Sequence, residues 1–166
     1  LNLFFNPICN DVGNAVGAAL EQCYQETGKN HIQPYMSLYL GNSYSDDEVV
    51  ADSKKFNFKI TKVNKVDSAI DLIERGKVIG WFQGRAEFGA RGLGNRSILS
   101  LATEQKYKDV VNEKVKKREA WRPFCPTIIE EKSEEILENS TYAPYMILGF
   151  NMKNPELYPA VCHVDG

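Results

Sequence analysis

A single stretch of this chain holds four of its twelve glycines, at positions 84, 89, 92 and 94. Glycine adopts backbone conformations that other residues avoid, and it lets the main chain come close to a ligand. The flanking residues, 77–82 and 97–102, carry bulky apolar side chains that are typical of strands. We therefore expect two strands joined by a long glycine-rich loop, and this loop limits the folds open to the chain.

The loop begins a basic region, residues 84–124, within an acidic protein. The region contains ten Lys or Arg and five Asp or Glu, a net charge of +5, whereas the whole chain carries −2 and the remainder −7. Planar guanidinium groups and unhindered backbone N–H groups suit the oxygens of phosphate. The region is therefore predicted to bind an anion, with phosphate as the first candidate. A pI near 5.8 argues against general nucleic-acid binding, for which domains are usually strongly basic.

Size and composition predict one domain with a core, or one domain together with a fragment of another. No apolar run approaches the roughly 20 residues of a membrane helix, so no membrane partner is expected. The apolar start, residues 1–5, lacks the basic region of a signal peptide and resembles a strand cut from a longer chain. The four cysteines show neither CxxC pairing nor metal-ligand spacing, which indicates free thiols and a cytoplasmic location.

Hydrophobic periodicity predicts a mixed α/β fold. Helices are expected over a segment that ends at Gly28 and over about 46–54, 67–75, 104–115 and 133–138. Strands are expected over 1–5, 37–41, 56–63, 77–82, 97–102, 127–130, 145–152 and 160–164. The sheet would then have at least six strands, with connections too irregular for a repeating βαβ fold.

Three arginines, Arg85, Arg91 and Arg96, are interleaved with the glycines, together with one acid, Glu87. One interpretation is a surface hairpin whose arginines are solvated, and the other is a ligand-binding loop between two strands. The loop is not a P-loop, because no Gly-Lys-Ser/Thr follows at the right spacing. It is also not a Gly-x-Gly-x-x-Gly turn that enters a helix.

A second group of cations follows a helix expected to end near Val115, and its members are Lys116, Lys117, Arg118 and Arg122. Cations at this place favour the negative end of the helix dipole, which is a purely structural interpretation. The adjoining Trp-Arg-Pro-Phe run, residues 121–124, would supply apolar walls that reduce solvent screening and strengthen anion binding. We therefore predict a second anion contact here.

Two longer runs carry a resemblance to a known family. They are Gly84-Arg85-x-Glu87-Phe88-Gly89-x-Arg91-x-Leu93-Gly94-Asn95-Arg96-Ser97 and Asn112-x-x-Val115-Lys116-x-Arg118-Glu119-x-x-Arg122-Pro123-Phe124-x-Pro126. The chain resembles, in order along its length, the C-terminal part of nodulation-type O-carbamoyltransferases, a family that includes enzymes that carbamoylate antibiotics. The family commonly has Gly-Pro-Arg-Ala-Leu-Gly at residues 89–94, and the extra glycine here should make the loop more mobile.

The resemblance implies two domains. Residues 1–30 look like the C-terminal tail of an actin-like carbamoyl-transfer domain, and residues 31–166 look like a YrdC-like, carbamoyl-adenylate-forming domain truncated at its C-terminus. A YrdC-like fold implies a twisted mixed sheet of parallel and antiparallel strands with flanking helices. The implied function is to bind ATP and carbamoyl phosphate and to form carbamoyl-adenylate, for transfer to a hydroxyl of a sugar-like or natural-product acceptor.

The resemblance also implies roles for individual residues. The expected catalytic residues would hold phosphate groups and are Lys116, Arg118, Arg91 and Arg96; Lys116 and Arg118 resemble the phosphate-gripping pair of YrdC-like domains. The expected substrate-binding residues are Arg85, Glu87, Asn95, Ser97 and Arg122. Asn95 and Ser97 would form hydrogen bonds with the carbamoyl amide. Arg85 and Arg122 would contact the substrate or orient Glu87 and Glu119. Such groups stabilise phosphoryl transfer by placement rather than by proton transfer.

The resemblance further makes Asp11 a metal ligand in the transfer site of the full-length enzyme. Fe2+ or another divalent metal would be held there with histidines of the missing domain, so this chain alone is expected to bind no metal at Asp11. Mg2+ is a candidate companion of ATP, and a homodimer is a candidate assembly. His31 and His163 are interpreted as structural residues rather than ligands.

Two other functions stay open on the sequence. A non-catalytic nucleotide- or RNA-binding YrdC-like module would also carry basic residues, although the acidic remainder of the chain disfavours an extended RNA surface. A structural domain would pair its arginines with acids and bind no ligand. The acceptor is not identified by these residues, because its recognition would lie largely in the missing domain.

Overall fold

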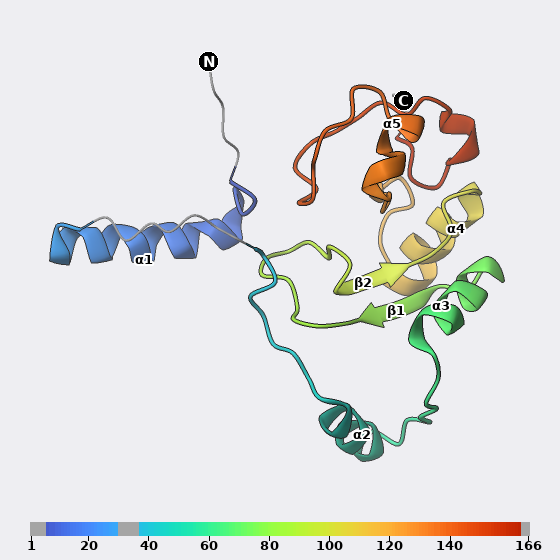
Figure 1. Ribbon diagram of the computed structural model, residues 1–166, viewed down its shortest axis with the longest axis horizontal. Coiled ribbons are helices and arrows are strands. Elements are labelled where there is room, and N and C mark those ends of the chain that lie inside the picture. The colour runs from blue at the N-terminus through green and yellow to red at the C-terminus, as the bar shows by residue number, and fades with distance from the viewer. Residues whose placement is uncertain (1–5, 30–36, 164–166) are drawn as a thin grey trace.

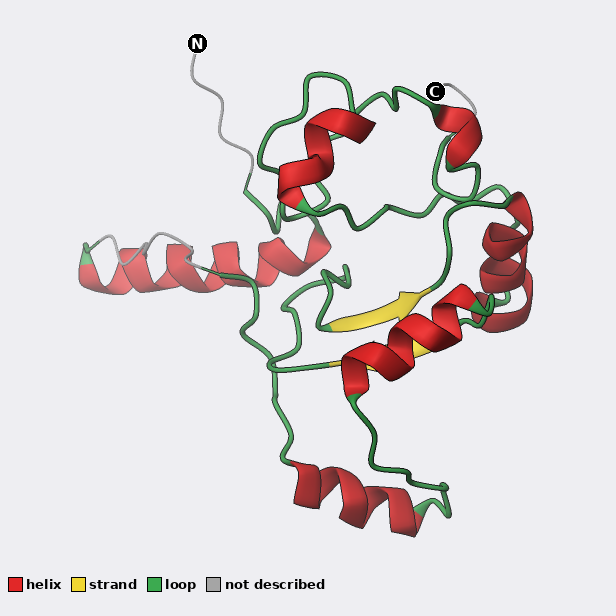
Figure 2. Ribbon diagram, turned by 45° about the vertical axis from the view of Figure 1, so that its right-hand side comes forward, coloured by secondary structure: helices red, strands yellow, loops and turns green. Residues whose placement is uncertain are grey.

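The computed structural model describes residues 6–29 and 37–163. In chain order its elements are α1 (Asp11–Thr27), α2 (Asp46–Lys55), α3 (Lys65–Glu74), β1 (Ile79–Phe82), β2 (Arg96–Leu99), α4 (Gln105–Asp109), the π-helix η1 (Val110–Lys116), the 3-10 helix η2 (Glu130–Lys132), α5 (Ser133–Ile136) and the 3-10 helix η3 (Pro155–Leu157). The helices α1 and α2 extend from the rest of the molecule, whereas α3 and α4 lie close to the two strands (Figure 1, Figure 2).

The helix ends follow from local capping chemistry. Helix α2 begins with a capping box, in which the Ser45 hydroxyl accepts from Glu48 N at 3.3 Å and Glu48 Oε2 accepts from Ser45 N at 2.8 Å. In α1, Asn10 accepts from Val12 N at 3.0 Å, and Gly28 ends the helix in the left-handed conformation with φ 66°. The sequence prediction of these two helices is therefore confirmed.

The two strands that flank the glycine-rich loop pair with each other. Strands β1 and β2 are antiparallel, with Ile79 opposite Leu99 and Phe82 opposite Arg96. Just beyond the pairing, Gln83 N donates to the carbonyl of Asn95 at 2.9 Å, so the ladder continues into the loop. The two strands and the long loop between them are as the sequence predicted.

The predicted sheet of at least six strands is wrong for the described residues, which contain a two-stranded sheet. The segments 37–41, 56–63, 127–130 and 145–152 are not strands, and the segment 1–5 lies outside the described residues. Alternating side chains form a strand only where a neighbouring strand supplies hydrogen bonds and one face is covered. In 56–63 neither holds, and Phe56 and Phe58 are 69% and 68% exposed.

The α/β class is confirmed as helices with a small antiparallel sheet, and no parallel pair is found among the described residues. Two weaker contacts occur where strands were predicted. The segment 38–42 bonds to the loop through Gly41 N to Ala86 O and Ala86 N to Asn42 O, both at 2.9 Å. Leu137 and Met152 form an isolated antiparallel bridge.

Buried apolar side chains are spread over several segments, and among the described residues they are Ile8, Leu38, Val111 and Ala160. Leu38 lies under the base of the glycine-rich loop, because its carbonyl accepts from Phe88 N at 2.6 Å. Val111 lies in η1, the helix that precedes the second group of cations. Two of these four buried side chains, Leu38 and Val111, therefore lie next to the predicted anion contacts. No helix in the described ranges is long and apolar enough to cross a membrane.

Candidate anion-binding site

The glycine-rich loop is folded around the carboxylate of Glu87. Its Oε1 accepts three backbone N–H groups, from Leu93 at 2.5 Å, Asn95 at 2.8 Å and Arg96 at 3.2 Å. The side chain is fully buried. Burial raises the pKa of Glu87, but the hydrogen bonds from these backbone groups outweigh it, so the pKa lies below its ordinary value. Glu87 is therefore ionised at neutral pH.

Two of the loop arginines bind carbonyl groups of the fold itself. Arg96 Nη2 donates to the carbonyls of Glu87 at 3.3 Å and Gly89 at 3.1 Å. Arg85 reaches the neighbouring segment, where it donates to Gly41 O at 3.0 Å and to Leu40 O at 2.7 Å. Both guanidinium groups thus hold the loop in place, and both remain partly exposed.

The neutral residues of the loop are also engaged within it. Asn95 Nδ2 donates to Arg85 O at 2.8 Å, and Ser97 Oγ accepts from Gly94 N at 3.1 Å. Gly92 packs against the start of β2, because a Cβ placed there would lie 2.4 Å from the Arg96 carbonyl oxygen. The loop is therefore closed by its own hydrogen bonds and by one close backbone contact.

Arg91 differs from the other two arginines of the loop. Within the described ranges no acidic side chain pairs with its guanidinium, and the hydrogen bonds that close the loop do not involve it. Its charge lowers the pKa of Arg118 and offsets part of the rise that burial causes in the pKa of Cys125. Arg91 also lines one cavity with Phe124 and Cys125, which directly follow the second cationic group.

Arg118 lies where the two groups meet. Its pKa is lowered, chiefly because burial disfavours its charge and secondly because of the nearby charge of Arg122. Glu119 acts in the opposite direction, and Arg91 lowers the pKa further. The guanidinium also lies over the ring of Phe124, 4.9 Å from its centroid. Arg118 thus lies beside an aromatic ring, and the charges of Arg122 and Arg91 act on it.

Asn112 holds Arg118 in this position, and the sequence analysis assigned it no role. The residue is fully buried. Its Nδ2 donates to the carbonyls of Ala120 at 3.1 Å and Arg122 at 2.9 Å, and its Oδ1 accepts from Arg118 Nε at 2.7 Å. The available signal was its place at the head of the second motif, six residues before Arg118.

The helix that carries Asn112 is not regular. The sequence predicted one helix over 104–115, whereas the structure has α4 followed by the π-helix η1, which ends at Lys116. Lys117 then takes a left-handed conformation with φ 48° and donates its N–H to Asn112 O. Lys116 is exposed and has no acidic partner in the part of the chain that is described. Arg122 faces Glu119 at 3.9 Å on the surface, a weak pair.

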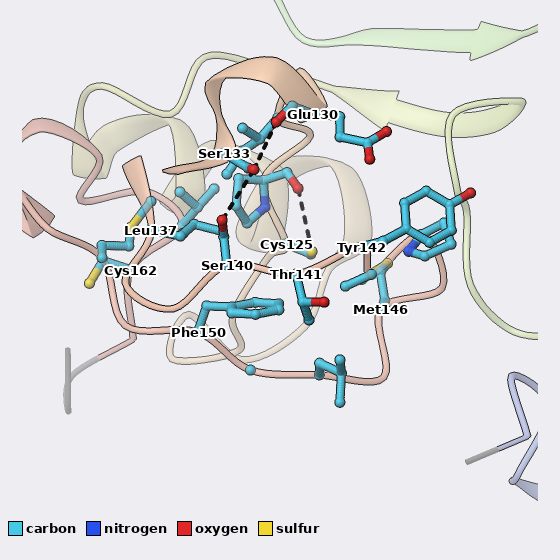
Figure 3. Close-up of a pocket in the computed structure, with 18 of the residues that line it drawn as sticks. Cys125, Glu130, Ser133, Leu137, Ser140, Thr141, Tyr142, Met146, Phe150 and Cys162 are labelled. Atoms are coloured by element: carbon cyan, nitrogen blue, oxygen red, sulfur yellow. Dashed lines mark hydrogen bonds between the residues drawn. The ribbon is translucent and has the colours of Figure 1, made fainter. Parts of the chain in front are cut away.

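A cavity of about 920 Å³ opens beside Arg91, Phe124 and Cys125. Its other walls come from the C-terminal third of the chain, which the sequence analysis did not include in the site. Figure 3 shows Tyr142, Met146 and Phe150 around it, and Ser133 bonded to Glu130 O at 2.8 Å. The cavity thus combines apolar and aromatic walls with one guanidinium at its edge.

Asp11 lies apart from this site. It is the exposed first residue of α1, beside a smaller hollow of about 420 Å³ that Asn10 and Asn14 also line. Among the residues described by the structure, no three His, Cys, Asp or Glu side chains gather in a way that could hold a metal ion. The metal role of Asp11 therefore stays a prediction for a longer protein.

Comparison with known proteins confirms the resemblance carried by the two sequence runs. A family model described as carbamoyltransferase C-terminus matches residues 70–166. Nodulation protein NolNO of Sinorhizobium fredii is 36% identical over 177 residues, and nodulation protein NolO of Bradyrhizobium diazoefficiens is 35% identical over 176 residues. The 3'-hydroxymethylcephem-O-carbamoyltransferase of Streptomyces clavuligerus is 32% identical over 166 residues. Each match covers 99% of this chain but 26%, 32% and 30% of the respective relative.

Proposed function

The chain belongs to the carbamoyltransferase C-terminus family, and from this membership we propose that it forms the carbamoyl-adenylate-forming part of an O-carbamoyltransferase. The observation that carries the proposal is the guanidinium of Arg91, which has no acidic partner among the described residues and lies at the edge of a large cavity that Phe124 also lines. Arg118 lies over the ring of Phe124, so a polyanion bound at this edge would give both guanidinium groups a counter-charge. ATP and carbamoyl phosphate are such polyanions.

The proposed reaction balances only when one water enters. Water takes up the phosphoryl group of carbamoyl phosphate, which releases inorganic phosphate and leaves carbamate. A carbamate oxygen then bonds to the α-phosphorus of ATP while the bond from that phosphorus to the bridging oxygen breaks, and pyrophosphate leaves. In the rest of the protein, an acceptor hydroxyl would lose its proton and bond to the carbamoyl carbon, and AMP would leave.

The cations supply electrostatic stabilisation for this chemistry. Charge shifts along phosphoryl oxygens during adenylation, and preorganised guanidinium and ammonium groups lower the barrier without moving a proton. We assign the phosphate contacts to Arg91, Arg118 and Lys116, whose charges have no acidic partner among the described side chains. Arg96 keeps its proposed place beside them, although it also binds the loop. Mg2+ would accompany the ATP phosphates.

The cavity beside Arg91 is the proposed place of the nucleoside. Phosphates bound at its edge would leave the base among aromatic side chains such as Phe124, Tyr142 and Phe150. Aromatic and apolar walls with a few polar groups are typical of small-molecule sites. The acidic residues Glu130 and Glu134 on the same wall suit ribose hydroxyls or a cation rather than phosphate.

Isothermal titration calorimetry of the 166-residue chain with ATP and with carbamoyl phosphate tests the proposal. Arg91→Ala and Lys116→Ala should weaken binding at least tenfold. Arg75→Ala is the matched control, because Arg75 pairs with Asp71 on the surface of α3 and should leave binding unchanged. Incorporation of labelled pyrophosphate into ATP, dependent on carbamoyl phosphate, then tests the chemistry.

Three outcomes would reject the proposal. Neither ligand binds to the parent chain, or both bind equally well after the two substitutions. Alternatively, an RNA oligonucleotide binds more tightly than ATP with an affinity that falls steeply with salt, which would favour an RNA-binding module instead.

A further inference from the structure

We propose that Glu87 is a positioning residue of the anion site, because its carboxylate fills the ring of loop N–H groups and so holds Arg91 at the cavity. The proposal rests on the proposed function for the identity of the ligand, whose phosphates Arg91 would bind. It differs from a substrate contact, since the carboxylate is buried within its own loop.

The first step is the closure of residues 88–92. The bond from Leu93 N to Glu87 Oε1, at 2.5 Å, joins the two ends of this segment. Arg91 lies within the closed segment, so this bond and its companions limit how far the main chain around it can move. The bonds from Asn95 N and Arg96 N to the same oxygen extend the closure to the start of β2.

Arg96 holds the same segment through a second set of contacts. The guanidinium of Arg96 bonds the carbonyls of Glu87 and Gly89, and its Nε lies 4.0 Å from Glu87 Oε2. Oε2 is buried and accepts no hydrogen bond in the described structure. Arg96 is therefore the nearest cation that compensates this oxygen, and the carboxylate depends on it.

The third step is the anchoring of the loop base to the rest of the fold. Tyr39 Oη donates to Leu93 O at 3.0 Å, and Phe88 N donates to the carbonyl of the buried Leu38 at 2.6 Å. Both ends of the closed segment are thus tied to one neighbouring stretch, 37–42. These bonds restrict the main chain at both ends of the segment that carries Arg91.

These contacts change how the glycine-rich loop is interpreted. Successive backbone N–H groups in such loops commonly bind phosphate. Here the N–H groups of Leu93, Asn95 and Arg96 are already occupied by the protein's own anion. We infer that the ligand phosphates are bound by side chains, Arg91 above all, and that the glycines serve to wrap the main chain around Glu87.

Amide resonances test this inference without any ligand. In ¹H–¹⁵N spectra of the chain, Glu87→Gln should shift the amide protons of Leu93 and Asn95 upfield, because a neutral oxygen accepts more weakly than a carboxylate. Glu87→Ala should shift these amide protons further. Added acetate should return them toward their positions in the parent, with an effect that saturates as its concentration rises, whereas the same concentration of NaCl should not. Glu156→Gln, an exposed acid of η3, is the matched control and should leave both resonances in place.

Affinity provides the second readout. Glu87→Gln, which keeps the shape of the side chain, should weaken ATP and carbamoyl phosphate binding about tenfold, and acetate should rescue the Glu87→Ala variant. The inference is overturned if Glu87→Gln leaves the amides unshifted, or if it shifts them while both ligands bind as in the parent. If the parent binds neither ligand, the proposed function fails, and the amide spectra alone decide the role of Glu87.

Discussion

Asn112 Oδ1 accepts a 2.7 Å hydrogen bond from Nε of Arg118, which fixes one edge of the guanidinium to the buried end of a π-helix. The same guanidinium lies over the ring of Phe124, which lines the cavity. π-Helical turns are rare and are frequently found at functional sites. The pair therefore connects an irregular helix to the proposed phosphate contact.

Replacement of Asn112 should both destabilise the chain and weaken its anion site. Asn112→Ala leaves the carbonyls of Ala120 and Arg122 without their donor in a buried place, which costs about 2–4 kcal/mol of unfolding free energy. Urea denaturation followed by circular dichroism measures this loss. Asn154→Ala is the control, since its side chain does not cap η3, and it should stay within about 0.5 kcal/mol of the parent. Equal stability of both variants would contradict a structural role for Asn112.

Arg91 and Arg96 of the glycine-rich loop should respond in opposite ways to replacement by alanine. Arg96→Ala removes two hydrogen bonds to carbonyls and the cation nearest to Glu87, so unfolding free energy should fall by about 1–3 kcal/mol. Arg91→Ala removes only repulsion with Arg118 and should leave stability unchanged or slightly higher. Thermal melts in low salt compare the two. A lower melting temperature for Arg91→Ala than for Arg96→Ala would show that Arg91 is structural.

Glu87 should make the stability of the chain depend on pH in the acid range. Its folded pKa is below the ordinary 4.5, so the native carboxylate binds fewer protons than the unfolded one. The stabilisation is fully present above the unfolded pKa and is lost as the pH falls through the folded pKa. Arg96 and Tyr39 are the charged or titratable groups that face it. Unfolding free energies from pH 7 to 3 should converge for the parent and Glu87→Gln, and parallel curves would contradict the assignment.

Two glycines should differ in their tolerance of a methyl group. Gly92→Ala places a Cβ 2.4 Å from the Arg96 carbonyl oxygen, so the main chain must shift and about 1–3 kcal/mol should be lost. Gly17→Ala, in the middle of α1, has no atom within 4 Å of the new Cβ and should gain about 0.4–1 kcal/mol. Chemical denaturation of both variants decides between them. A neutral Gly92→Ala would mean that the loop adapts, as the related motif with alanine suggests.

The parts of the fold that were predictable from sequence are those set by neighbouring residues. The Ser45–Glu48 capping box and the left-handed Gly28 depend on contacts within a few positions, and both were found as expected. The strand predicted over 56–63 needed a distant partner, which the described residues do not supply, and the one predicted over 145–152 formed only an isolated bridge at Met152. Alternation of side chains alone therefore overestimated the sheet.

The candidate site shows the same division. Arginines of both basic runs could be identified as anion contacts from composition and motif, and those assignments stay predictions. That Arg91 meets Arg118 depends on how the loop and η1 pack, and no spacing in the sequence contains that information. The hydrogen bonds of Asn112 and Glu87 could not be predicted from the sequence either. Each joins two groups that come together only when the main chain has folded.

A loop that carries its own counter-ion has its shape before any ligand arrives. Fixing the backbone of one residue costs about 1–2 kcal/mol in conformational entropy, and a loop that orders only on binding subtracts that cost from affinity. Around Glu87 the ordering takes place during folding, so the proposed anion would meet the guanidinium of Arg91 on a preorganised frame. Recognition at this site should therefore be fast and reversible, with little conformational rearrangement of the main chain between empty and occupied protein.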